Sequence, residues 1–332
     1  MGRDGRPLLV TATVDVVLLF PGQGSQKPGM GKDLAGAFPE ARAVFDRADT
    51  ALGAPLSRLM FEGPAEELTL THNTQPALLA HGAAVWATLQ SRLAGRVRAA
   101  AGHSLGEFTA YHAAGSVSLD DALRLVRRRG ELMYETGVKR PGAMAALLGD
   151  LAVPVEEVCA QASAEAGLVS PANYNSPGQI VISGEEAGVE RAMALAREAG
   201  AKRAMRLNVS GAFHSALMET ALDGLTQAVE ATRFDDPAFP VYANVNAEAV
   251  TSAERARALL LQQLTRPVRW TDEVEAMARR YPEALFVEMG PGSVLVGLVK
   301  KIAPAVKTMT CGTAAEVGQL LSQAPAGAAG AA

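Results

Sequence analysis

The stretch Arg98-Ala99-Ala100-Ala101-Gly102-His103-Ser104-Leu105-Gly106-Glu107 decides the fold. Its first half is small and apolar, which predicts a buried strand ending at Gly102, and residues 107–114 have the pattern of a helix. A serine between two glycines at such a turn is typical of a nucleophile elbow, because the missing Cβ atoms let the chain turn sharply and present the hydroxyl. The helix directs unpaired N–H groups toward it. Ser104 is therefore the candidate nucleophile, and the backbone N–H of Leu105 is a candidate oxyanion donor.

Strand and helix patterns alternate on both sides of this turn. Residues 14–20 form a continuous apolar, β-branched run that stops at Pro21-Gly22, as expected for a parallel strand buried on both faces. A further strand pattern covers residues 284–288, and helix-period segments cover residues 75–93 and 119–137. This alternation predicts an α/β domain with helices on both faces of a sheet.

The segment from residue 142 to residue 208 has shorter elements, in the order strand, helix, strand, strand, helix, strand. That order is the ferredoxin-like split βαβ pattern. We therefore expect a discontinuous catalytic domain of residues 1–140 and 208–323, a ferredoxin-like subdomain of residues 141–207, and a disordered Ala- and Gly-rich tail of residues 324–332. The expected strands are 143–148, 168–173, 179–183 and 202–207, and the expected helices are 154–166 and 185–199.

The composition excludes several classes of protein. Of the 332 residues 48% are hydrophobic, so the chain can bury a full core. Its 31 basic and 35 acidic residues are well mixed, and a net charge of -4 provides no basic field for nucleic acid. Cys159 and Cys311 belong to no CxxC pair or Cys/His cluster, so we expect no metal site and a reducing, cytoplasmic location. The apolar run within residues 1–13 is too short for a signal peptide or a membrane span, and we expect a loose leader there.

A serine nucleophile needs a base, and the chain has five histidines. His103 adjoins the nucleophile and should point away from it, His112 is two helical turns along the next helix, and His72 and His81 precede the elbow. His214 remains, in a glycine-containing loop before a helical segment of residues 216–231. Spacing alone identifies no carboxylate partner for His214. Acidic residues such as Asp150, Glu156 and Asp223 are available, and a backbone carbonyl is the alternative, because the third member of a triad holds the tautomer.

One arginine stands out on the helix of residues 119–137. Projection at 100° per residue places an apolar stripe on one face, with Arg129 at its edge, whereas Arg124, Arg127 and Arg128 fall to the sides with ordinary solvated charges. A guanidinium at the edge of a core is costly unless acceptors meet it. It is either an internal salt bridge or snorkelling side chain, or a fork that grips a substrate carboxylate.

With these residues in place, the sequence resembles the malonyl-CoA:acyl carrier protein transacylases and the related acyltransferase domains of polyketide synthases. The resemblance covers nearly the whole chain and keeps its motifs in the same order. The motifs are Phe20-Pro21-Gly22-Gln23-Gly24-Ser25-Gln26, Thr74-Gln75-Pro76-Ala77, the Gly102–Glu107 elbow, Arg129-Gly130, Asn173-Tyr174-Asn175-Ser176-Pro177-Gly178-Gln179, Gly211-Ala212-Phe213-His214-Ser215, Gln263-Leu264, Pro267-Val268-Arg269-Trp270 and Glu288-Met289-Gly290-Pro291-Gly292.

The resemblance implies a ping-pong reaction without a bound cofactor. Ser104, activated by His214, would attack the malonyl thioester of coenzyme A, and the phosphopantetheine thiol of an acyl carrier protein would then take the acyl group. The backbone N–H groups of Gln23 and Leu105 would form the oxyanion hole. The implied fold is an α/β-hydrolase-like large domain with a ferredoxin-like insert and the active site between them, and the implied partners are malonyl-CoA and acyl carrier protein, with neither nucleic acid nor membrane.

The same resemblance assigns roles around the acyl group. Arg129 would bind the free carboxylate of malonate, and the main-chain carbonyl of Gln263 would orient the histidine. Because polyketide relatives with Phe before the histidine select malonyl over methylmalonyl, Phe213 predicts malonyl. We expect Met133 to take part in specificity and Gln75 to line the pocket. One methyl group changes the free energy of binding by only about 1 to 3 kcal/mol, so selectivity need not be strict.

Two other classes of function compete with this interpretation. A thioesterase or lipase would share the elbow and the histidine but would pass the acyl group to water, and Arg129 and the insert argue against it. A scaffold protein would keep the fold without the chemistry, which the intact Ser104, His214 and Arg129 argue against.

Overall fold

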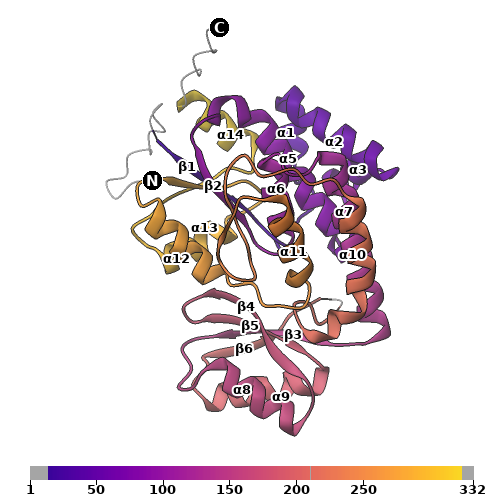
Figure 1. Cartoon of the computed structure of the whole chain (residues 1–332), viewed down its shortest axis with the longest axis vertical. Helices are drawn as coiled ribbons and strands as arrows, with labels where there is room; N and C mark the ends of the chain where they lie inside the picture. The colour runs from indigo at the N-terminus through magenta and orange to yellow at the C-terminus, as the bar shows by residue number, and fades with distance from the viewer. Residues whose placement is uncertain (1–13, 210, 324–332) are drawn as a thin grey trace.

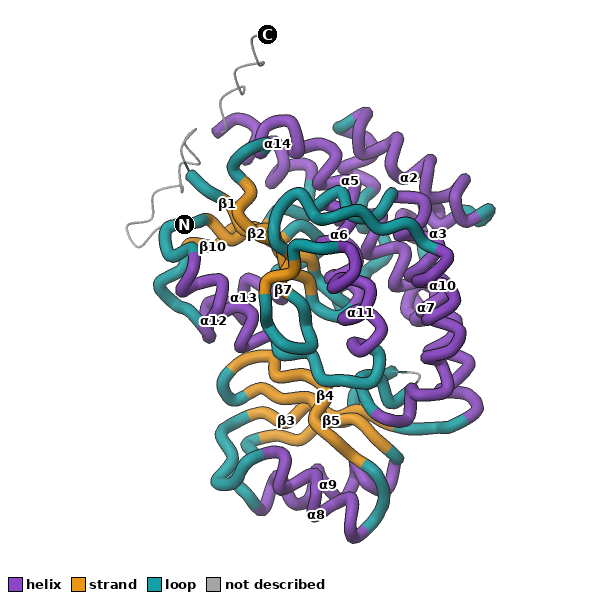
Figure 2. Tube along the Cα trace, viewed as in Figure 1, coloured by secondary structure: helices purple, strands orange, loops and turns teal. Residues whose placement is uncertain are grey.

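The computed structural model describes residues 14–209 and 211–323, so the expected leader (1–13) and the expected tail (324–332) lie outside the described residues. Two sheets organise these residues, and Figure 1 shows the smaller sheet, with its two helices, at one end of the molecule. Figure 2 shows the strands gathered in these two groups, with helices and long loops around them. The mixed α/β architecture expected from the sequence is confirmed.

The larger sheet has six strands in the order β10-β9-β1-β2-β7-β8. The first five are parallel, and β7 and β8 form an antiparallel pair at one edge. All five residues of β1 are buried, which explains its uninterrupted apolar sequence. The strands are β1 (Val16–Phe20), β2 (Val97–Gly102), β7 (Val241–Tyr242), β8 (Ala249–Val250), β9 (Leu285–Glu288) and β10 (Lys307–Thr310).

Alternate residues of β1 enter different cores, as the pleat of a strand requires. Val16, Leu18 and Phe20 belong to the larger core, whereas Val17 and Leu19 pack with residues of α12 and α13. The larger core receives most of the other helices. The helices around this sheet are α1 (Lys32–Ala37), α2 (Pro39–Leu52), α3 (Leu56–Glu62), α4 (Ala65–Thr69), α5 (Thr71–Leu93), α6 (Leu105–Ala113), α7 (Leu119–Lys139), α10 (Leu222–Ala231), α11 (Ala253–Gln263), α12 (Trp270–Arg280), α13 (Val294–Ile302) and α14 (Ala314–Gln323).

The smaller sheet is antiparallel, with the strand order β4-β5-β3-β6. Its chain order and strand order are those of the ferredoxin-like pattern expected for this segment. One face of β3, with Ala143, Ala145 and Leu147, packs against α8 and α9, and the other face, with Met144 and Ala146, joins the larger core. The elements are β3 (Ala143–Leu148), α8 (Val155–Glu165), β4 (Val169–Ser176), β5 (Gln179–Gly184), α9 (Glu186–Glu198) and β6 (Arg203–Arg206).

Several details differ from the sequence expectation, among them the start of one helix and the burial of one arginine. The helix expected for residues 216–231 begins as a 3-10 helix, Ala216–Ala221, and becomes α-helical only in α10. Arg127, expected to be solvated, is half-buried and donates a hydrogen bond to Asn73 Oδ1 at 2.7 Å. Across the described ranges, no helix is long and apolar enough to cross a membrane.

Candidate active site

The parallel register of β1 and β2 brings two loops together at the carboxyl end of the larger sheet. Phe20 pairs with Gly102 at the last position of both strands, and His103 N donates to Phe20 O at 3.0 Å. The loop after β1 therefore lies against the elbow. The loop and the elbow are in close contact, because a Cβ added to Gly22 would lie 2.5 Å from the backbone O of His103. The carboxyl end of a parallel sheet is where such folds place their ligands.

Ser104 sits at a strained turn between β2 and α6. Its φ of 52° is in a region that residues with a side chain rarely adopt, as at other elbow nucleophiles. The flanking glycines make the turn possible, since a Cβ on Gly102 would lie 1.9 Å from Gly106 C and a Cβ on Gly106 would lie 2.1 Å from Phe20 O. The strand, turn and helix predicted for this stretch are thus present.

His214 faces this serine from the loop that follows the smaller sheet. Its Nε2 lies 2.8 Å from Ser104 Oγ, and its Nδ1 lies 2.9 Å from the backbone O of Gln263 and 3.2 Å from that of Arg266. Two carbonyl acceptors place the proton on Nδ1, which leaves the lone pair of Nε2 to accept from the serine hydroxyl. A backbone carbonyl, not a carboxylate, therefore contacts the imidazole, and Arg266 is a second contact that the sequence did not indicate.

The imidazole is kept neutral by its surroundings. His214 is 4% exposed, and burial lowers its pKa from 6.5 to about 3. The nearby Arg129 cation acts in the same direction, whereas the two carbonyls oppose it. A neutral imidazole beside a hydroxyl is in the state that a general base requires.

Arg129 lies deeper than the helix projection indicated. It is 1% exposed instead of lying at the edge of the core. Its Nη1 donates to Gln75 Oε1 at 2.7 Å, and its Nη2 donates to Gln263 Oε1 at 2.8 Å and to Ser104 Oγ at 3.1 Å. Burial lowers its pKa to about 10, which still leaves it charged at neutral pH, and Glu107 raises the pKa.

Within the described residues, the charge of Arg129 is not paired with a carboxylate. In the part of the chain that the structure describes, no carboxylate oxygen comes within 4.0 Å of it, and its buried Nε has no hydrogen-bond partner. The salt bridge considered as an alternative is thus absent from these residues. The guanidinium retains donors for a further acceptor.

The serine opens into a small cavity of about 110 Å³. A second hollow, of about 430 Å³, shares Gln23 and Val209 with it. The cavity brings together most of the residues singled out from the sequence. Its lining comprises Gln23, Gln75, His103, Ser104, Leu105, Arg129, Met133, Met144, Asn173, Leu207, Val209, Phe213 and His214.

The two expected oxyanion donors both line this cavity. Leu105 is the first residue of α6, so its N–H has no partner inside the helix. Gln23 is held by its side chain, whose Oε1 accepts from Thr71 Oγ1 at 2.9 Å. Neither backbone N–H makes a hydrogen bond with an acceptor in residues 14–209 or 211–323. Both remain available to a ligand.

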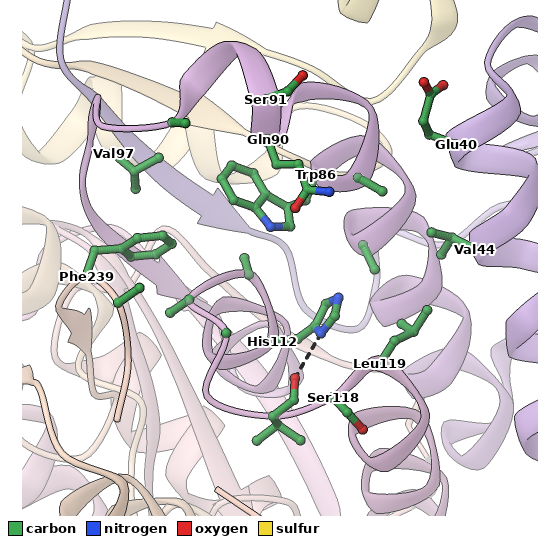
Figure 3. A pocket seen from close by; sticks show the side chains of 18 of the residues that line it. Glu40, Val44, Trp86, Gln90, Ser91, Val97, His112, Ser118, Leu119 and Phe239 are labelled. Carbon is green, nitrogen blue, oxygen red and sulfur yellow. Dashed lines mark hydrogen bonds between the residues drawn. The ribbon is translucent and has the colours of Figure 1, made fainter. Parts of the chain in front are cut away.

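Two other histidines, His103 and His112, hydrogen-bond to groups other than the serine hydroxyl. His103 Nε2 pairs with Asn175 Oδ1 at 2.8 Å, and its ring packs against Trp270. His112 Nδ1 lies 3.0 Å from Val117 O. It lines a separate open hollow of about 1170 Å³ beside Trp86, which Figure 3 shows and which shares no lining residue with the serine cavity.

One residue that holds the elbow, Asn244, is not indicated by any sequence motif. Its Oδ1 accepts from the backbone N of Ser104 at 2.8 Å, and its Nδ2 donates to Gly102 O at 2.8 Å. It is fully buried and follows the short strand β7. Its only signal in the sequence is a polar residue directly after the apolar residues 241–243. Within the described ranges, no group of His, Cys, Asp and Glu is arranged to hold a metal ion.

Comparison with known proteins agrees with this geometry. Residues 17–321 match the acyl transferase domain family. The malonyl CoA-acyl carrier protein transacylase of Bacillus subtilis (strain 168) is 46% identical over 295 residues, which are 89% of this chain and 92% of the relative. The acyl-carrier-protein-S-malonyltransferase of Bartonella henselae is 43% identical, with a TM-score of 0.88 over 93% of this chain and 98% of that chain. A malonyl-transacylase in complex with its type II PKS acyl-carrier protein is 41% identical, with a TM-score of 0.88 over 93% of this chain and 99% of that chain. The chain therefore belongs to the acyl transferase domain family, in the group of the malonyl-CoA:acyl carrier protein transacylases.

Proposed function

We propose that this protein transfers the malonyl group of malonyl-CoA to the phosphopantetheine thiol of an acyl carrier protein, through an ester on Ser104. One observation carries the proposal: Ser104 Oγ contacts both a neutral imidazole, at 2.8 Å, and a buried guanidinium, at 3.1 Å, in one small cavity. A nucleophile and its base serve any acyl transfer. The added cation selects an acyl group that ends in a carboxylate.

In the first half-reaction, Ser104 Oγ attacks the thioester carbon while its proton moves to His214 Nε2. The negative charge that develops on the carbonyl oxygen is stabilised by the backbone N–H groups of Gln23 and Leu105. The C–S bond then breaks, and the imidazolium returns the proton to the departing thiolate. Coenzyme A leaves, and the malonyl ester remains.

The second half-reaction runs through the same groups. The phosphopantetheine thiol gives its proton to His214, and its sulfur attacks the ester carbon. The bond from carbon to Ser104 Oγ breaks, and the serine recovers the proton. The hollow that shares Gln23 and Val209 with the cavity is our proposed path for both thiol arms. No step needs a cofactor beyond the thioester itself.

We assign the surrounding residues as follows. Gln263 orients His214 through its carbonyl, Gln75 holds Arg129, and Phe213 and Met133 form the wall beside the acyl group. We further propose a catalytic domain of residues 1–140 and 208–323 and a subdomain of residues 141–207, which supplies Met144 and Asn173 to the cavity. The two free, buried cysteines fit a cytoplasmic location, where such substrates occur.

The test is a two-step transfer followed by intact-protein mass spectrometry. Malonyl-CoA alone should add one malonyl group to the chain, and peptide mapping should place it on Ser104. A phosphopantetheinylated carrier protein should then gain the group as the enzyme loses it. Release of free malonate without transfer would instead identify a hydrolase, and the absence of any covalent adduct would contradict the proposal.

The size of the acyl cavity gives a prediction for Phe213, which is 5% exposed and lines the cavity. Phe213→Ser should increase the use of methylmalonyl-CoA relative to malonyl-CoA by about tenfold or more, because the smaller side chain makes room for one methyl group. Phe213→Leu, which keeps most of the volume, is the matched control. Competition between the two thioesters, read by mass spectrometry, measures the ratio. An unchanged ratio in Phe213→Ser would remove Phe213 from the wall of the pocket.

The buried imidazole gives a prediction of pH dependence. Because the pKa of His214 is lowered to about 3, its ring should remain neutral at pH 5, well below the ordinary value of 6.5. The unfolded chain binds a proton in this window and the folded chain does not, so this group's contribution to stability is complete above pH 6.5 and is lost as the pH falls toward 3. NMR of histidine labelled with 13C in the ring, assigned with His214→Asn, follows the titration directly. A midpoint near 6.5 would contradict the prediction.

A further inference from the structure

A carboxyl group lies one helical turn beyond the nucleophile, buried beneath it. Glu107 is 0% exposed, and its Oε2 accepts from Gln263 Nε2 at 2.6 Å and from the backbone N of Asn244 at 3.2 Å. Its Oε1 has no partner among the described residues. Both groups that contact this carboxyl are hydrogen-bond donors. No described acceptor is placed to accept a hydrogen bond from a protonated Glu107. The geometry therefore suits the carboxylate form.

The side-chain amide of Gln263 connects this carboxylate to Arg129. The amide nitrogen faces Glu107 Oε2, the backbone O of Ser104 at 3.0 Å and Asn244 Oδ1 at 3.2 Å, all of which are acceptors. The amide oxygen must then point the other way, toward Arg129 Nη2 at 2.8 Å. The orientation of the amide is thus set by its partners. The result is a chain of hydrogen bonds from guanidinium to amide to carboxylate, which is assisted by charge at both ends.

No other described anion is placed to balance the charge of Arg129. A second buried carboxyl, Glu273, contacts Asn244 Nδ2 at 3.0 and 3.3 Å and reaches the guanidinium only through further residues. Burial raises its pKa well above the ordinary value, and repulsion from Glu107 adds to that, so both effects favour its neutral form. The Tyr111 hydroxyl, on the same helix as Glu107, is also neutral. A buried cation without a counter-ion is strongly destabilising.

We propose that Glu107 is a positioning residue, which serves as the counter-ion of Arg129 in the unloaded enzyme through the side-chain amide of Gln263. The proposal rests on the proposed role of Arg129. It assigns no contact between Glu107 and the substrate. When the carboxylate of an acyl group binds Arg129, it takes over part of the neutralisation that Glu107 provides before loading. Glu107 therefore competes with the substrate for the cation while keeping that cation in place.

The test compares Glu107→Gln with the wild type at pH 8, above the pKa of about 7 to which burial raises this carboxyl. The amide keeps an acceptor for Gln263 and removes only the charge. We expect the free variant to melt at a lower temperature, and excess malonyl-CoA to raise its Tm by about 1 to 2 °C more than it raises that of the wild type. The KM for malonyl-CoA should fall on the order of fivefold or more. The kcat should change far less than the KM, because the carboxylate of the bound malonyl group then balances the charge of Arg129.

Two controls keep the outcomes separate. Glu288→Gln removes another buried carboxyl, one that accepts from the backbone N of Leu295 and Val296, and it should show the wild-type Tm increase with malonyl-CoA. The neutral double variant Glu107→Gln/Arg129→Met should lose less stability than the sum of the two single variants, because no cation is left unbalanced. This double variant also covers the case in which Glu107→Gln alone does not fold.

Different unexpected results would overturn different parts of the proposal. Additive losses of stability in the double variant, or an equal Tm increase in Glu107→Gln and the wild type, would overturn the counter-ion role. If malonyl-CoA and acetyl-CoA raised the Tm of the wild type equally, the carboxylate clamp itself would be wrong. The comparison of malonyl-CoA with acetyl-CoA tests the proposed function. The double variant and the Tm increase of Glu107→Gln test only the counter-ion role, which depends on that function.

Discussion

In the Ser104→Ala variant we expect no covalent acyl-enzyme and a loss of malonyl transfer of about four to six orders of magnitude. Every step of the proposed reaction forms or breaks a bond to Ser104 Oγ, and among the described residues that line the cavity there is no second nucleophile with a base in contact. The remaining groups, Arg129 and the two N–H donors, can bind the thioester but cannot accept its acyl group. Residual activity would come only from direct attack by the carrier thiol.

The variant should fold like the wild type, which makes the comparison clean. The contacts that hold the turn are the backbone N of Ser104 with Asn244 Oδ1 and the backbone O of Ser104 with Gln263 Nε2, and the substitution leaves both in place. Intact-protein mass spectrometry after mixing with malonyl-CoA measures the adduct. The control is Ser163→Ala, on α8, where the hydroxyl contacts only the backbone of Val169. A stable malonyl adduct in Ser104→Ala would show that another residue carries the acyl group.

The sequence predicted those parts of the site that depend on local spacing. The two glycines around Ser104 specify the turn by themselves, because the close contacts at Gly102 and Gly106 arise within a few residues of the serine or from the neighbouring strand. His214 could be identified because the chain has only five histidines, and the other four adjoin the nucleophile, lie along the next helix or precede the elbow. The long buried strands of the sheet were found for a similar reason, since β1 has apolar residues at every position.

The features of the site that the sequence did not predict depend on contacts between distant segments of the chain. Asn244 is 140 residues from Ser104, and no local pattern marks a single buried amide. Periodicity identified the face of α7 that carries Arg129 but not its depth, which is set by Gln75 and Gln263 from other helices. The same holds for Arg127, whose partial burial depends on a distant residue, because it donates a hydrogen bond to Asn73 from α5. The edge strands β7 and β8 have two residues each, too few to show alternation.

The expected effect of changing Arg129 follows from how completely it is buried. In Arg129→Met we expect kcat/KM for malonyl-CoA to fall by about two to three orders of magnitude, because the malonyl carboxylate would enter the cavity without a cation to pair with. The rate with acetyl-CoA should change far less, since a neutral acyl group loses no partner. The ratio of malonyl to acetyl transfer should therefore fall by most of that factor.

Arg129→Lys is the matched control for this result. Lysine keeps the charge but has neither the planar fork nor the reach to contact Gln75, Gln263 and the substrate together, so we expect an intermediate ratio. Acyl-enzyme formation with each thioester, followed by rapid quenching and mass spectrometry, measures both rates. If the malonyl-to-acetyl ratio in Arg129→Met equalled that of the wild type, the cation would serve only to support Ser104 Oγ and Gln263. Selection of the diacid would then have to come from the shape of the cavity, which the Phe213 variants measure independently.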